Sequence, residues 1–388
     1  MTTLATYKRW LANRPVSVHL LLSLIAFCWL SAKLIGWKVW VAERTFPVIA
    51  PFDLLYQVPS AGHWVLLGLS IILLVLLIIK PGNKYAQCTL FFSEIASCLL
   101  DENRWQPWEY LYLFILGIFI LNRTKLSHVA ACLVITLATV YIYSGLHKFN
   151  ESFIINMWQT TILKRFFKVP PVLYKAGWMH YLGYLLPFIE TAGGLGLLFS
   201  KTKKTAAVLL TAMHIFILLL IGPIGLHYNK IVWPWNTVMI LLLYFLFIRN
   251  QMISIVERRG LEIRNKIILV AWAVLPALNF IGFWDNYLSW NLYSSRIPRM
   301  IICIKDTAAT TPLRSYYSGN HTSKICNGKV LLNVQDWSMR EMAVPPYPEE
   351  RVYKRMEVQW NKTYPLAHAD FVIYYSPFKK DSASSINQ

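Results

Sequence analysis

The fold is decided by residues 61–79, which read AGHWVLLGLSIILLVLLII and contain no charged side chain. A helix needs about 20 apolar residues to cross the hydrocarbon core of a bilayer, so this run is predicted to span a membrane. Of the 388 residues, 56% are hydrophobic and 15% are charged, whereas a soluble domain carries about 25% charged residues. The whole chain therefore has the composition of a membrane protein.

Further apolar runs on both sides of this segment predict a helical bundle over residues 1–290. With it, they lie at 16–36, 61–79, 86–100, 108–122, 129–146, 181–200, 205–226, 234–249 and 267–284. The run at 86–100 is short and carries Glu94, so the expected number of spans is eight or nine. The predicted fold class is an all-α polytopic membrane helix bundle, followed by a small C-terminal α+β soluble domain at 300–388.

The placement of basic residues predicts the orientation. The formal net charge is +19, and 27 of the 38 basic residues lie before residue 300, mostly between apolar runs. Cytoplasmic loops collect Lys and Arg, so the basic start with Lys8, Arg9 and Arg14 indicates a cytoplasmic N-terminus. Nine spans then place the C-terminal domain outside the cytoplasm. Nucleic-acid binding is not predicted, since neither a basic helix nor an aromatic stacking platform accompanies the charge.

Residues 147–180 are an exception to this charge pattern. They form a predicted outer connection, yet they carry several basic residues together with apolar stretches too short to span. Such a segment is typical of chain that lies in the headgroup layer, where its lysines meet lipid phosphates. A lid over a cavity is the alternative that the sequence leaves open.

The C-terminal part, residues 300–388, has the composition of a small soluble module. Short β-rich runs predict strands at 301–305, 330–334 and 371–375, and a helix is expected at 346–360. Cys303 and Cys326 both fall in this part. A disulfide between them is an option if the domain lies outside the cytoplasm.

A polar cluster ends the apolar run at 129–146. Residues 143–150 read YSGLHKFN, which places His147 and Lys148 side by side where a helix leaves the bilayer. Ionisable groups at such a position are costly unless a lipid headgroup, a partner or a reaction uses them. Lys148 is therefore a candidate catalytic residue. Its alternative role is to anchor the helix by extending its amine to lipid phosphates.

Three more ionisable residues fall inside predicted spans. Glu190 lies mid-span and is expected to pair with Lys148 or His214, or to be protonated, because an isolated carboxylate is costly there. Its structural alternative is a polar clamp between helices, and that of His214 is a core histidine bonded to a neighbouring helix. Glu94 is a weaker candidate. A common cavity containing these groups would favour a functional site, and a scattered arrangement would not.

An ordered set of motifs resembles the HTTM family, the membrane domain related to vitamin K-dependent γ-carboxylase. The cluster at 143–150 is similar to the family's glycine–lysine signature, and DoxX-like membrane proteins share a weaker version of it. Three further matches follow in family order: ETAGG at 190–194, MH at 213–214 and VWPW at 232–235.

The resemblance implies a lysine base that starts oxygenation of a reduced quinone, with a histidine nearby. Lys148 and His214 stand at those positions. His147 and Asn150 replace the family's second lysine and its aspartate, and the C-terminal part is much shorter than that of the carboxylase. γ-Carboxylation itself is therefore not predicted.

Two functional hypotheses follow. In the first, the bundle has an outward-facing polar cavity with Lys148, His214 and Glu190 as catalytic candidates, His147 and Glu94 as cofactor-binding candidates, and a quinone or other lipid-soluble molecule as ligand. In the second, the chain is a non-catalytic anchor or accessory subunit that presents residues 300–388 to a protein partner. A transporter is a third option, disfavoured because no broken-helix repeat pair is visible. No metal site is predicted, since metal-binding motifs such as H-E-x-x-H are absent from the sequence.

Overall fold

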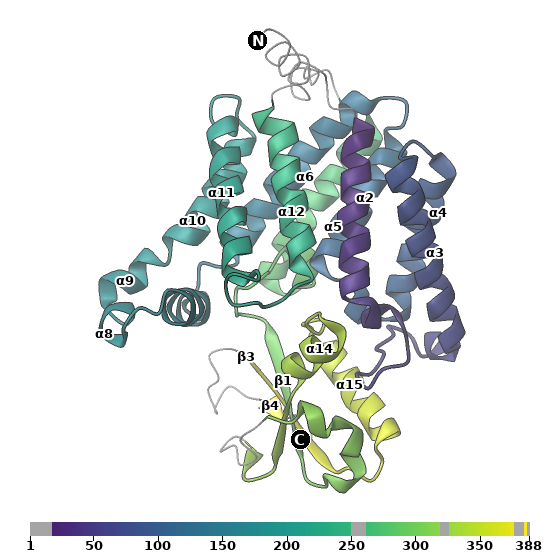
Figure 1. The fold of residues 1–388 in the computed structure, drawn as a ribbon, viewed down its shortest axis with the longest axis vertical. Coiled ribbons are helices and arrows are strands. Elements are labelled where there is room, and N and C mark those ends of the chain that lie inside the picture. Colours follow the sequence, from purple (N-terminus) through teal and green to yellow (C-terminus); the bar gives the residue numbers. More distant parts are fainter. Residues whose placement is uncertain (1–17, 250–260, 319–325, 376–383, 386–388) are drawn as a thin grey trace, which may run out of the picture.

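The computed structural model describes residues 18–249, 261–318, 326–375 and 384–385. In it, a helical bundle stands on a small domain that contains a sheet (Figure 1). The basic start predicted from Lys8, Arg9 and Arg14 lies outside the described residues. The helix α2 (Val18–Ile35) begins at the end of the bundle that is far from the sheet.

Among the described residues, five helices are long and apolar enough to cross a membrane. They are α2, α3 (Ser60–Ile79), α6 (Leu126–Leu146), α11 (Lys203–Ile221) and α13 (Ile263–Val274), the last of which continues as η6 (Leu275–Ile281). Four shorter helices of the bundle are α4 (Lys84–Leu100), α5 (Pro107–Leu121), α10 (Leu185–Leu197) and α12 (Val232–Leu243), which continues as η5 (Tyr244–Ile248). The predicted helix bundle is confirmed in this coarse form, and its long apolar helices are compatible with a membrane, whereas the number of spans stays a prediction.

The predicted run at 181–200 is interrupted near its start. Helix α9 (Gly177–Leu182) ends at the second residue of this run, and α10 begins at Leu185 and ends at Leu197. The turn at Gly183 lies against the indole ring of Trp158, where a Cβ atom would be 2.5 Å from the ring. This close approach leaves no room for a Cβ atom at Gly183, and α10 is shorter than the apolar run at both ends.

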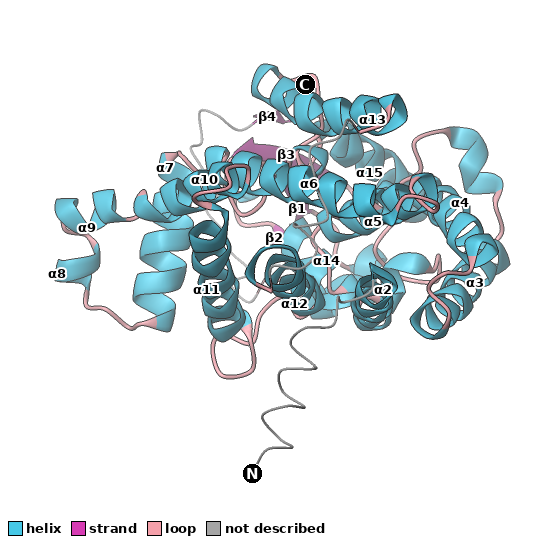
Figure 2. Cartoon of the chain, turned by 90° about the horizontal axis from the view of Figure 1, so that it is seen from above, coloured by secondary structure: helices cyan, strands magenta, loops and turns pink. Residues whose placement is uncertain are grey.

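Residues 151–182 form an arm beside the bundle, made of α7 (Glu151–Phe153), the π-helix η4 (Ile154–Phe166), α8 (Pro171–Tyr174) and α9. The arm extends sideways from the end of the bundle that faces the sheet (Figures 1 and 2). It exposes seven large apolar side chains: Ile155, Phe167, Val172, Leu173, Trp178, Tyr181 and Leu182. Exposed apolar groups with Lys164 and Arg165 nearby are what a segment in the headgroup layer needs. That placement stays a prediction.

The C-terminal domain is an antiparallel sheet with strand order β2-β1-β3-β4 and two helices. The elements are β1 (Pro298–Ile304), β2 (Val330–Asn333), α14 (Val334–Met342), α15 (Glu350–Thr363), β3 (Ala369–Tyr375) and β4 (Ser384–Ser385). The three predicted strands are confirmed. The predicted helix starts four residues later than expected, at Glu350, because Pro346 and Pro348 precede it in extended chain. Cys303 and Cys326 form a disulfide.

This domain is fixed to the loops at one end of the bundle. The Glu341 carboxylate of α14 accepts the backbone N–H groups of Thr45 (2.6 Å) and Phe46 (2.9 Å). Glu102, in the short helix η3 (Glu102–Arg104), pairs with two arginines of α15, Arg351 at 2.8 Å and Arg355 at 2.5 Å. Charge-assisted bonds from separate elements hold one orientation of the domain. The C-terminal domain is therefore held in one orientation against this end of the bundle.

Glu349 gives this interface a predicted pH dependence. Its Oε1 accepts both the backbone N–H (2.7 Å) and the side-chain N–H (2.9 Å) of Asn286. Burial, with Asp285 nearby, raises the pKa of Glu349 to about 7. A raised carboxyl pKa means that the folded state binds the proton more tightly, so this contribution to stability is complete below the unfolded pKa and is lost as the pH rises through about 7.

Glu349→Gln is therefore expected to remove about 2 kcal/mol of the pH-dependent change in stability between weakly acidic and weakly alkaline solution. The amide oxygen keeps both bonds from Asn286. Thermal unfolding of the purified protein across this pH range measures the difference. Glu350→Gln, at the exposed next position, is the control and should leave the profile unchanged. An unaltered profile in Glu349→Gln would contradict the assignment.

Candidate functional site

Lys148 and Glu190 form an ion pair between the end of α6 and the middle of α10. The Lys148 Nζ atom lies 2.5 Å from Glu190 Oε2 and donates to Ser144 Oγ at 2.9 Å. The lysine and glutamate side chains are only 12% and 8% exposed. Partial burial strengthens their attraction, since little water screens it. The structure thus brings together the two candidates that the sequence proposed as partners.

Two glycines allow this pair to form. A Cβ atom on Gly145 of α6 would be 2.7 Å from the backbone nitrogen of Thr191, and one on Gly194 of α10 would be 2.8 Å from that of Ile142. Both distances are shorter than carbon contacts allow, so the two backbones approach closely only because these residues are glycines. The glycine contact therefore sets the separation at which Lys148 reaches Glu190.

His214 of α11 belongs to a second polar group, which joins α11 to α6 and α12. Its Nε2 is 2.7 Å from the Tyr141 hydroxyl of α6, and its Nδ1 is 2.7 Å from the Asn236 side-chain oxygen of α12. Asn236 donates its own N–H to Val232, so its oxygen accepts from Nδ1–H. A neutral imidazole then accepts from the Tyr141 hydroxyl at Nε2, and both nitrogens are bonded, as the alternative of a core histidine requires.

His147 is not part of the ion pair although it precedes Lys148. Its ring stacks on Phe280 of η6, with 4.5 Å between the ring centroids, and the residue is 8% exposed. Among the described residues its Nε2 has no hydrogen-bond partner. A buried nitrogen without a partner is rare, and it provides a position where a polar ligand atom is favoured.

Glu94 is not brought into this group. It lies in α4, where it accepts from Lys33 of α2 at 2.7 Å and from the Ser70 hydroxyl of α3. A second carboxylate, Glu109 of α5, lies 3.8 Å from the same lysine. Sequence analysis missed Lys33 and Glu109. The available signal was a charged residue inside the runs at 16–36 and 108–122.

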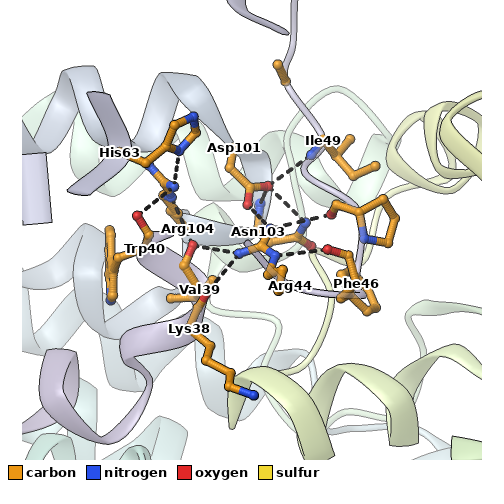
Figure 3. A network of polar contacts seen from close by, with 12 residues as sticks. Lys38, Val39, Trp40, Arg44, Phe46, Ile49, His63, Asp101, Asn103 and Arg104 are labelled. Carbon is orange, nitrogen blue, oxygen red and sulfur yellow. Dashed lines mark hydrogen bonds and ion pairs between the residues drawn. The ribbon is translucent and has the colours of Figure 1, made fainter. Parts of the chain in front are cut away.

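Arg104 organises a further polar network at the end of α4 (Figure 3). All five of its N–H groups are used, on Val39 O, Trp40 O, Ser97 O, Ser97 Oγ and His63 Nδ1. Arginine cannot accept a hydrogen bond, so His63 Nδ1 is the acceptor. Burial lowers the pKa of Arg104 to about 10, which still leaves it protonated at neutral pH. The signal that sequence analysis passed over is the polar run Asp101-Glu102-Asn103-Arg104 between two apolar runs.

Comparison with known proteins gives no family assignment. No family model matches the chain, and searches of curated proteins and of solved structures find no match either. The resemblance to HTTM and DoxX-like proteins therefore stays a prediction from the motifs.

Proposed function

We propose that the chain is an integral membrane protein with nine spans, a cytoplasmic N-terminus and a C-terminal domain outside. The start of α2 and the sheet lie at opposite ends of the bundle, which favours an odd number of crossings (Figure 1). The Cys303–Cys326 disulfide favours an oxidising compartment for the sheet. A protease added to intact cells should cleave the C-terminal domain, and cleavage only after lysis would overturn this orientation.

We propose further that Lys148 acts in proton transfer to or from a lipid-soluble molecule of the quinone class. The observation that carries this proposal is its ion pair with Glu190 at a helix end, beside an arm of exposed apolar side chains. A lysine can exchange a proton with a ligand when a neighbouring carboxylate and hydroxyl hold its amine in place. The HTTM resemblance suggests the quinone.

The residue types present suit such a ligand. A hydroquinone needs polar partners for its hydroxyl groups and an apolar surface for its ring. The unpartnered Nε2 of His147 against Phe280 offers one such combination. In the ammonium form that its ion pair with Glu190 favours, Lys148 would orient a ligand oxygen or donate a proton to it. It would accept a proton from a hydroxyl group only after passing its own proton to Glu190, and the ligand itself would supply any redox chemistry. His214, with both nitrogens bonded, would act through Tyr141.

Lys148→Met is expected to weaken binding of a short-chain hydroquinone about tenfold or more, because a hydrogen bond to a charged group contributes about 1.5–3 kcal/mol. Quenching of tryptophan fluorescence in the purified protein measures the affinity. Lys204→Met, at an exposed lysine near the start of α11, should bind as the wild type does. Lys148→Met/Glu190→Gln removes both charges, so it separates loss of the ligand contact from the effect of an unpaired carboxylate.

Failure of the wild-type protein to bind hydroquinone, together with no quinone found by mass spectrometry after native purification, would refute the ligand class. Equal binding by wild type and Lys148→Met would refute the role of the lysine. The alternative of an anchor presenting residues 300–388 is less well supported, because Glu341 and the pairs that Glu102 makes with α15 hold the domain against the bundle.

A further inference from the structure

Two carboxyl groups share one lysine in the interior of the bundle, away from the Lys148 pair. Lys33 Nζ lies 2.7 Å from Glu94 Oε2 and 3.8 Å from Glu109 Oε1. The three side chains are 1%, 1% and 0% exposed. They come from α2, α4 and α5, so packing of three helices assembles the group. A second ionised carboxylate without its own cation is strongly disfavoured in such a place.

The hydrogen-bond donors around the two carboxyl groups are unequal. Glu94 accepts from both Lys33 and Ser70, so each of its oxygens has a donor. Glu109 Oε2 accepts from the Trp29 indole N–H at 2.7 Å. The remaining oxygen, Oε1, has no donor within hydrogen-bond distance among the described residues.

Because Glu94 Oε2 and Glu109 Oε1 lie 2.7 Å and 3.8 Å from the same Lys33 Nζ atom, the two carboxyl groups are close neighbours. Two ionised carboxylates cannot bond to each other, because each offers only acceptors. One proton between them converts this repulsion into a hydrogen bond, and like-charged carboxyl pairs in enclosed sites hold a proton for this reason.

The other charged groups nearby do not neutralise Glu109. Arg44 and Asp101 pair with each other. Arg104 directs all five N–H groups to Val39, Trp40, Ser97 and His63, and none to a carboxylate. From α4, the Cys98 thiol contacts the Arg104 carbonyl. From α3, Ser70 contributes a neutral hydroxyl. Lys33 is thus the cation in direct contact with the two glutamates.

We propose that Lys33, Glu94 and Glu109 form a proton-binding site in the bundle interior, in which the two glutamates hold one proton between them. The ligand is the proton itself. The site is separate from Lys148 and does not depend on the function proposed above. Its loaded and empty states differ by one charge inside the bundle, which is the property that proton-coupled membrane chemistry requires.

Infrared spectroscopy of the protein in lipid vesicles tests this assignment, since a protonated carboxyl group has a carbonyl stretch distinct from that of a carboxylate. Glutamate labelled with ¹³C identifies the residue type. The measurement is made in alkaline solution, where Glu349 and other accessible carboxyl groups are ionised. The wild type should show a glutamic acid band, and its absence would overturn the proposal.

Substitutions distinguish one proton shared by Glu94 and Glu109 from two carboxyl groups that bind protons independently. Glu109→Gln and Glu94→Gln should each abolish the band, because one remaining carboxylate pairs with Lys33. Lys33→Met should double the band area, because both carboxyl groups then hold a proton. Glu190→Gln, at the Lys148 ion pair, is the matched control and should leave the band unchanged. A band that survives Glu109→Gln, or an unaltered area in Lys33→Met, would overturn the proposal.

If a variant fails to fold, the proposal is still tested by the labelled wild type and by Glu190→Gln. The wild-type band must shift in heavy water and persist in Glu190→Gln. Loss of the band in Glu190→Gln would assign the proton to the Lys148 pair and exclude the site proposed here. Quinone binding is not used as a readout, so this test and that of Lys148 can fail separately.

Discussion

Replacing Arg104 with methionine is expected to lower the free energy of unfolding by about 4 kcal/mol. The side chain is fully buried and bonds to the chain before α3, to His63 of α3 and to Ser97 of α4 (Figure 3). Methionine has a similar length but no donors, so three backbone carbonyl groups and His63 Nδ1 would lose their partners. Thermal unfolding in detergent measures the loss, and Arg314→Met, at an exposed arginine, is the control.

Arg104→Lys extends this test. Lysine keeps the positive charge but has three donors on one nitrogen, whereas the guanidinium spreads five donors over a plane. Since the acceptors at Arg104 lie on different elements, lysine should recover only a minor part of the lost stability. Full recovery by lysine would show that charge alone matters. An Arg104→Met protein with wild-type stability would contradict the role of the network.

The sequence predicted the helices well because apolar length alone decides which segments can lie in a membrane. The run at 61–79 became α3, and the strands at 301–305 and 330–334 appeared within a few residues of the predicted bounds. Boundaries were predicted less accurately. The run at 181–200 contains a turn at Gly183, where the Trp158 ring lies close, and no local pattern announces such a contact.

The polar pairs were harder to predict than the helices. Lys148 and Glu190 were expected as partners because both are costly in an apolar environment and have the right signs. Lys33 and Glu109 were passed over because each lies near the end of an apolar run whose average hydropathy hides one charge. Their pairing depends on how α2, α4 and α5 are rotated about their axes. Helices that are apolar on all sides carry little information on that rotation.

Gly194→Ala is expected to destabilise the protein by about 3 kcal/mol, because inserting a methyl group into a filled contact strains its neighbours. The new carbon would lie 2.8 Å from the Ile142 nitrogen and 3.0 Å from the Ala138 carbonyl oxygen. Backbone atoms cannot rotate away as a side chain does, so α6 and α10 must separate. Thermal unfolding again gives the size of the effect.

Gly68→Ala is the matched control, since the same substitution in α3 meets no atom within 4 Å. Alanine favours a helix over glycine by roughly 0.5–1 kcal/mol, so this variant should be slightly more stable than the wild type. If Gly194→Ala lowers the stability and Gly68→Ala raises it, the loss at Gly194 is due to the contact between α6 and α10. Separation of these helices also moves Lys148 from Glu190, so Gly194→Ala should weaken hydroquinone binding while Gly68→Ala leaves it unchanged. If the two variants are equally stable, an alanine fits at Gly194 without strain. The helices α6 and α10 would then lie further apart than the Lys148–Glu190 ion pair requires.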